Sequence, residues 1–136
     1  EVHSDSQGDT RTAGESVLKA IQRTEDERIK PRILTSQLIK NVEDHHAQLI
    51  NRTRMGMMLL RGDTLFVLEV EPAGYAYYAA NEAEKAANIK IIDVTGFGKF
   101  GRVYIGGPEA EVLECKSIVE KRLAEVTGRS SKEDYK

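Results

Sequence analysis

The stretch that decides the fold runs from Leu65 to Val94 and reads LFVLEVEPAGYAYYAANEAEKAANIKIIDV. Residues 65–70 are largely apolar and rich in β-formers, which indicates a strand. Pro72-Ala73-Gly74 ends that strand. Residues 75–88 predict a helix, because alanine is the best helix former. Residues 89–94 predict a second strand, so the stretch indicates a strand-helix-strand unit.

The pattern continues downstream of this unit. A glycine-punctuated loop over 95–101 precedes a predicted third strand over 102–105. Gly106-Gly107-Pro108 then turns the chain. A predicted helix over 109–126 follows, with Pro108 as its first helical residue. Gly128 is predicted to end that helix as the C′ residue. In that helix apolar residues recur at helical spacing, namely Val112, Cys115, Val119, Leu123 and Val126. This order predicts an α+β fold, an antiparallel sheet with helices on one face.

The upstream half gives weaker patterns. Residues 1–13 are polar and predict a disordered tail, and residues 14–28 predict a short helix with a narrow apolar stripe. Residues 32–39 predict a strand, and Asn41 predicts the cap of a helix that reaches Asn51.

The run Met55–Leu60 fits a helix end, a strand or a loop, and those alternatives stay open. Arg61-Gly62-Asp63 predicts a turn, and the apolar runs on either side of it allow a hairpin.

Composition narrows the classes of function. The 136 residues predict one domain, and 20 basic against 22 acidic side chains give a net charge of −2. That balance does not favour binding to nucleic acid or to anionic lipid. The chain has no apolar run of about 18 residues, so no membrane partner is predicted. It also shows no apolar leader, so we expect it in the cytoplasm.

The sequence predicts no catalytic, metal or cofactor site. His45 and His46 are adjacent in a predicted helix, where neighbouring side chains point about 100° apart, so they are poor joint metal ligands. Cys115 is the only cysteine and lies on an apolar stripe, which indicates a buried thiol rather than a nucleophile. The loop Gly96–Gly101 is not a phosphate cradle, because a strand rather than a helix follows it.

Two interpretations of the role of this loop remain open. Its glycines allow positive φ angles and a close approach to another segment. Repeated around a symmetry axis, the same loop would line a pore and carry charge from Lys99 or Arg102. Three tyrosines at the start of the alanine-rich helix, Tyr75, Tyr77 and Tyr78, suit a subunit interface or a cap on the sheet.

The sequence resembles a known family over a little under half of the chain. The segment 65–94, above all AANEAEKAANI over 79–89, resembles the first strand, helix and second strand of a bacterial microcompartment shell domain. GRVYIGGPEAEV over 101–112 resembles the third strand and the start of the second helix of that domain. A standard domain continues into a fourth strand and a small helix. Residues 31–51 would supply these, as in circularly permuted shell proteins of ethanolamine-, propanediol- and choline-type compartments.

The resemblance implies a structural protein with a ferredoxin-like, permuted single domain. Such domains form cyclic homohexamers that tile with other shell proteins around enclosed enzymes, within the shell in the cytoplasm. The division implied is a tail and short helix over 1–28, a shell domain over 29–128 and a charged tail over 129–136. Tiling through an edge lysine would use Lys85 or Lys90. Further candidates for a subunit interface are Tyr75, Tyr77 and Tyr78.

By the same resemblance, the loop approaches the ring axis. The pore-lining candidates are Thr95, Gly96, Phe97, Gly98, Lys99, Phe100, Gly101 and Arg102. The alternative function is a trimeric regulator that senses a nucleotide or another small ligand on a ferredoxin-like core, with Lys99 and Arg102 as its basic contacts. A transferase-like enzyme is a third hypothesis for the function, since fold does not fix function.

Overall fold

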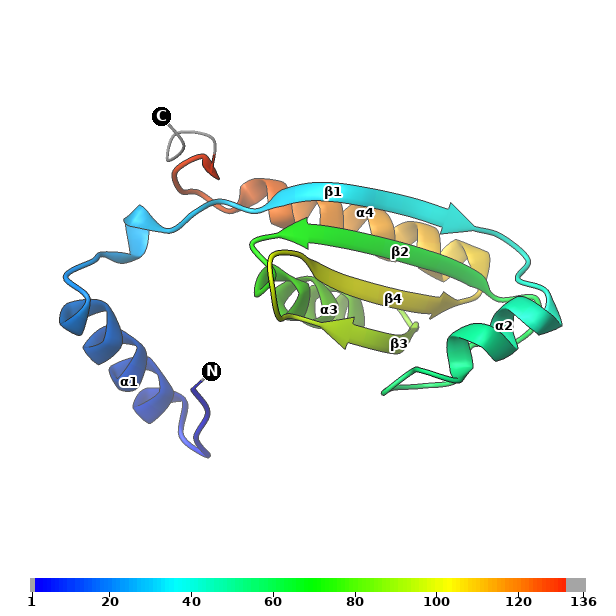
Figure 1. Cartoon of the computed structure of the whole chain (residues 1–136), viewed down its shortest axis with the longest axis horizontal. Helices are drawn as coiled ribbons and strands as arrows, with labels where there is room; N and C mark the ends of the chain where they lie inside the picture. The colour runs from blue at the N-terminus through cyan, green and yellow to red at the C-terminus, as the bar shows by residue number, and fades with distance from the viewer. Residues whose placement is uncertain (1, 132–136) are drawn as a thin grey trace. The chain divides into compact units, whose positions relative to one another are not determined.

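The computed structural model describes residues 2–131, which form two compact units (Figure 1). The larger unit is Pro31–Val126. The smaller unit joins the residues up to Lys30 with those that follow Val126. The boundaries predicted at residues 29 and 128 remain a prediction, and most of the predicted tail over 129–136 lies outside the described residues.

The larger unit is built on one four-stranded sheet. Its strands are β1 (Arg32–Ile39), β2 (Thr64–Glu71), β3 (Lys90–Thr95) and β4 (Gly101–Gly107). They lie in the order β1-β2-β4-β3, and every neighbouring pair is antiparallel. The helices of this unit are α2 (Asp44–Asn51), α3 (Tyr75–Ala86) and α4 (Glu109–Glu125). The predicted antiparallel α+β fold is therefore confirmed.

The main core lies between the sheet and the pair α3 and α4, which Figure 1 shows together behind the sheet. Side chains alternate across a strand, so Phe66, Leu68 and Val70 point to this face. Helix α3 contributes alanines, which let it approach the strands closely, and α4 contributes mostly larger apolar side chains. These helix residues are Ala76, Ala79, Ala80 and Ala83 of α3 and Val112, Cys115, Val119 and Leu123 of α4.

A second, smaller core covers part of the opposite face. Leu65 and Ile92 of the sheet pack there with Ala47 of α2, with Val42 before it and with Leu59 after it. Helices on one face are thus confirmed for α3 and α4, while α2 adds a partial cover on the other side. Asn41 does not cap α2 as predicted: Glu43 is the N-cap, and Asn41 adopts a φ of 50°, a left-handed turn that asparagine tolerates.

The segment between α2 and β2 does not form the hairpin that the sequence allows. Its backbone instead bonds to the outer edge of β3, through Gly56 N to Ile92 O at 2.9 Å and Met57 N to Ile91 O at 2.8 Å. The predicted turn over 61–63 is present, with Gly62 at a φ of 84°. The competing partner is β3 rather than β2, because β2 already lies between β1 and β4.

The smaller unit corrects the prediction for the first thirty residues. Helix α1 spans Gln7–Ala20, so it begins inside the stretch predicted to be a tail and ends before residue 28. Ser6 starts it by accepting a hydrogen bond from the Asp9 backbone N–H at 3.4 Å. Gln22 stops it with a φ of 54°, and a short 3-10 turn, Glu25–Glu27, follows.

Two helix-end predictions for α4 are shifted by one residue. Pro108 is the N-cap rather than the first helical residue. The C-cap is Val126, so Gly128 lies one position beyond C′. A Cβ at Gly128 would lie 2.4 Å from the Arg28 carbonyl oxygen, so close backbone packing, rather than helix termination, requires glycine there.

Candidate functional site

The loop between β3 and β4 is shaped by its glycines. Gly98 has a φ of 80°, the left-handed region that glycine enters without strain. A Cβ at Gly96 would lie 2.2 Å from the Tyr77 ring, and one at Gly101 would lie 2.2 Å from the Ala73 carbonyl oxygen. The interpretation that these glycines permit close approach is confirmed, and what they approach is the start of α3.

A row of polar side chains crosses the sheet next to this loop. Cross-strand pairing places Thr35 of β1 opposite Glu69 of β2, Glu69 opposite Arg102 of β4, and Arg102 opposite Thr95 of β3. Directly opposed residues have side chains close enough to bond. Arg102 donates from Nε to Glu69 Oε1 at 2.8 Å and makes a second, shorter bond from its terminal nitrogen. Thr35 donates to Glu69 Oε2 at 2.8 Å.

This row distributes charge unevenly around the loop. Hydrogen bonds from Arg102 and then from Thr35 hold the pKa of Glu69 below its ordinary value. The same bond to Glu69 raises the pKa of Arg102, whose guanidinium also lies 6.0 Å from the centroid of the Tyr104 ring. Within residues 2–131 Lys99 has no ion pair, and its ammonium sits 5.1 Å from the centroid of the Phe100 ring. Lys99 therefore carries the uncompensated charge of the loop.

The loop and the row enclose a shallow pocket of about 280 Å³. Its lining residues are Glu69, Thr95, Lys99, Phe100 and Arg102. Four of the eight predicted pore-lining residues thus meet in one place. Phe97 lies apart from them and packs edge-to-face on Tyr77, with ring centroids 6.3 Å apart.

Sequence reasoning missed Glu69, Thr35 and Tyr104. A signal existed for Glu69, because it is the one charged residue in the predicted strand over 65–70. Its partners depend on strand register, which the sequence does not display.

The Glu69 carboxylate makes stability depend on pH with a defined sign. Its pKa is lower in the folded chain than in the unfolded one, so its contribution is present above the unfolded pKa and is lost as pH falls through the folded pKa. We expect Glu69→Gln to lower the free energy of unfolding by about 0.5–1 kcal/mol at neutral pH. As pH falls from about 4 toward the folded pKa of Glu69, the difference from the parent chain should shrink, and below that pKa it should vanish.

Thermal unfolding of both chains between pH 3 and 7 measures this effect. Glu84→Gln, at an exposed position of α3, is the matched control and should show no such trend. A constant difference between Glu69→Gln and the parent at every pH would contradict the role given to Arg102 and Thr35.

The predicted interface residues are not gathered into one patch. Lys85 is 64% exposed and pairs with Glu82 at 3.0 Å, whereas Lys90 is only 24% exposed and pairs with Asp63 at 2.8 Å. Lys90 therefore braces the turn before β2, and Lys85 is the better placed to reach another molecule. Tyr77 and Tyr78 are exposed at the start of α3, while Tyr75 is half-buried.

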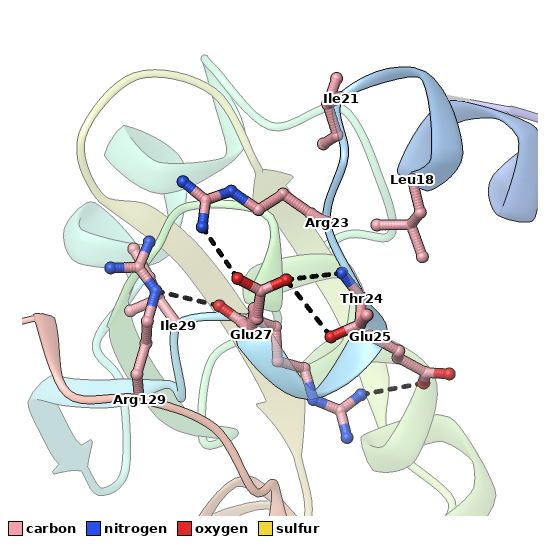
Figure 2. A pocket seen from close by; sticks show the side chains of 9 residues that line it. Leu18, Ile21, Arg23, Thr24, Glu25, Glu27, Ile29 and Arg129 are labelled. Carbon is pink, nitrogen blue, oxygen red and sulfur yellow. Dashed lines mark hydrogen bonds and ion pairs between the residues drawn. The ribbon is translucent and has the colours of Figure 1, made fainter.

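The smaller unit holds a second pocket, of about 270 Å³, which Figure 2 shows from close by. Glu27 organises it by accepting hydrogen bonds from the Thr24 backbone N–H and from Arg23, each at 2.8 Å. The Thr24 bond, followed by the Arg23 bond, lowers the pKa of Glu27. Leu18 and Ile21 give it an apolar wall. Its carboxylates and guanidiniums largely pair with one another, so it offers a ligand little free charge.

Metal-binding and thiol side chains elsewhere among residues 2–131 offer little chemistry. No group of three or more metal-binding side chains occurs in this part of the chain, so His45 and His46 gain no third ligand. Cys115 is buried, and that burial raises the pKa of its thiol to about 11. No helix in the same range is long and apolar enough to cross a membrane.

No family model matches the chain, but relatives are found among known proteins. It is 51% identical over 129 residues to the carboxysome shell protein CcmP of Synechococcus elongatus, a match that covers 95% of this chain and 61% of CcmP. It is 38% identical over 130 residues to the carboxysome shell protein CsoS1D of Hydrogenovibrio crunogenus, covering 95% and 63%. The chain belongs to the bacterial microcompartment shell proteins. It spans a little under two thirds of these relatives.

Solved shell proteins share the fold. A double-ringed trimeric shell protein of the RMM microcompartment superposes with a TM-score of 0.90 at 36% identity, covering 94% of this chain and 63% of its own. A fused permuted hexameric shell protein of the same microcompartment gives 0.82 at 42% identity, covering 87% and 60%. The order found here, with β1 and α2 ahead of β2, fits that permuted relative. These shell protein relatives do not favour the regulator, and they favour a structural role over catalysis.

Proposed function

We propose that this shell protein is a structural tile whose copies close into a ring, which packs with other shell proteins around enclosed enzymes. Its place would be the shell of a microcompartment in the cytoplasm. The observation that carries the proposal is the superposition on the double-ringed trimeric shell protein, at a TM-score of 0.90. The resemblance to shell domains implies six copies, and the trimeric relative supports a ring of three as the alternative.

We further infer that the loop over 95–102 lines the axis of this ring. The support is chemical and geometric. Glycines shape the loop, and Lys99 and Phe100 lie at its exposed pocket. Arg102 is held back on the sheet by Glu69, so Lys99 would set the charge of the opening. Lys85, exposed on α3, would serve contacts between rings.

The mass of the assembly in solution tests the ring directly. Light scattering after gel filtration should give six times the 15.2 kDa of the chain, or three times for the alternative. A mass equal to one chain at high protein concentration would overturn the proposal of a ring.

Chemical cross-linking tests the position of the loop. A symmetry axis brings the same residue of neighbouring copies together, whereas a peripheral residue is separated from its equivalents. We expect Lys99→Cys to give covalent dimers with a short bismaleimide, and dimers only, because each chain then carries one reactive thiol. Native Cys115 is buried and should stay silent.

Glu114→Cys, at an exposed position of α4, is the matched control and should remain monomeric on a denaturing gel. Equal cross-linking of both variants, or cross-linking of the control alone, would contradict the axial position of the loop.

A further inference from the structure

The segment that follows α2 exposes an unusual run of apolar side chains. Met55 is 89% exposed, Met57 56% and Met58 51%. Leu60 and, on α2 itself, Leu49 are also exposed. We call residues 55–60 the methionine segment. Isolated apolar residues on a surface need no explanation, but several exposed within a few positions mark a contact site.

The backbone of the methionine segment is fixed, so these side chains are not exposed by fraying. Gly56 and Met57 bond to the edge of β3, as described above. Leu59 is buried, and its backbone N–H and carbonyl bond to the Asn51 side chain at 2.9 and 2.8 Å. A Cβ at Gly56 would lie 2.3 Å from the Ile91 carbonyl oxygen, so the segment lies tightly against β3.

We propose that the methionine segment is a contact surface between copies of this chain, with its three methionines buried against a second copy. This inference rests on the ring proposed above. A ring is a heterologous assembly, in which each copy must present a surface that its neighbour covers. Methionine suits such a surface, since its flexible thioether adapts to the opposing side chains. Among residues 2–131 nothing covers these side chains, which stay exposed.

A second copy is the favoured occupant because of the solved relatives. The two with TM-scores of 0.90 and 0.82 are a double-ringed trimer and a hexamer, so copies of this fold pack on one another. The methionine segment lies along the outer edge of β3, at the end of the sheet opposite β1. It is therefore on the periphery of the larger unit, where a neighbouring copy can reach it.

Substitution of the exposed methionines tests the surface. The double variant Met55→Lys/Met58→Lys should stay folded, because both side chains are exposed and the buried Leu59 is kept. Its mass by light scattering should fall below that of the parent assembly at equal concentration. Met55→Leu/Met58→Leu keeps the apolar surface and is the matched control, with the parent mass expected.

Thiol labelling provides a second readout. In the assembly, the Met58→Cys thiol should be labelled by DTNB at least about ten-fold more slowly than the same thiol in a Met55→Lys background. Cys115 is buried and should stay silent in both. A lysine variant of unchanged mass, or equally fast labelling in both backgrounds, would overturn this inference while leaving the ring intact. A parent chain that is monomeric would instead remove the ring itself.

Discussion

Ala83→Arg is expected to lower the free energy of unfolding of the larger unit by about 4–5 kcal/mol or to prevent its folding. Ala83 is fully buried where α3 packs on α4 and the sheet. A guanidinium there would have no room, and burying its charge costs several kcal/mol. Urea unfolding followed by circular dichroism measures the loss, and light scattering should show that the assembly is lost with it.

Glu84→Arg is the matched control for this change. It places the same side chain one residue further along α3, at an exposed position. We expect a change within about 0.5 kcal/mol. If Ala83→Arg unfolded at the urea concentration of the parent, α3 would not dock on the sheet through its alanine face.

Elements with a local cause were predictable from the sequence. The apolar, β-forming residues of β2 and the alanines of α3 act locally, and both elements lie within about two residues of their predicted bounds. Helix α3 ends at Ala86 rather than at the predicted residue 88, because the chain bends there toward β3. The apolar stripe of α4, with Cys115 inside it, was equally readable and is buried as expected.

Elements decided by distant partners were not predictable. The composition of Met55–Leu60 suggests burial, yet only Leu59 is buried, because Asn51 and β3 fix the backbone of the segment. For α1, the error lay in treating its polar residues as a tail. A side-chain cap at Ser6 begins the helix, although none of its residues is buried.

In the candidate site too, features with a local cause were predictable and contacts with distant residues were not. The glycines at 96, 98 and 101 predict a loop with an unusual backbone. In the structure, a side chain would clash at 96 and 101 and would strain the backbone at 98. The bond between Glu69 and Arg102 depends on which strand lies beside β2 and in which register. Likewise the sequence leaves Lys85 and Lys90 equivalent, until Asp63 is found beside Lys90.

Gly101→Ala is expected to lower the free energy of unfolding by about 3 kcal/mol, at the upper end of the usual cost of overpacking. The added Cβ would lie 2.2 Å from the Ala73 carbonyl oxygen and 2.7 Å from the Ala76 Cβ. The first of these is a backbone atom, so relief requires β4 or the start of α3 to move. Because Gly101 directly precedes Arg102, that shift should also disturb the polar row.

Gly74→Ala is the control that isolates this clash from the general effect of adding a methyl group. Gly74 has a φ of −58°, and nothing lies within 4 Å of its Cβ position. We expect it to be neutral or to stabilise the chain by up to about 1 kcal/mol, since alanine restricts the unfolded state. Thermal unfolding of the two variants measures the contrast. Equal melting temperatures would mean that β4 does not approach α3 at Ala73, and the loop proposed to line the axis would lose the contact that positions it.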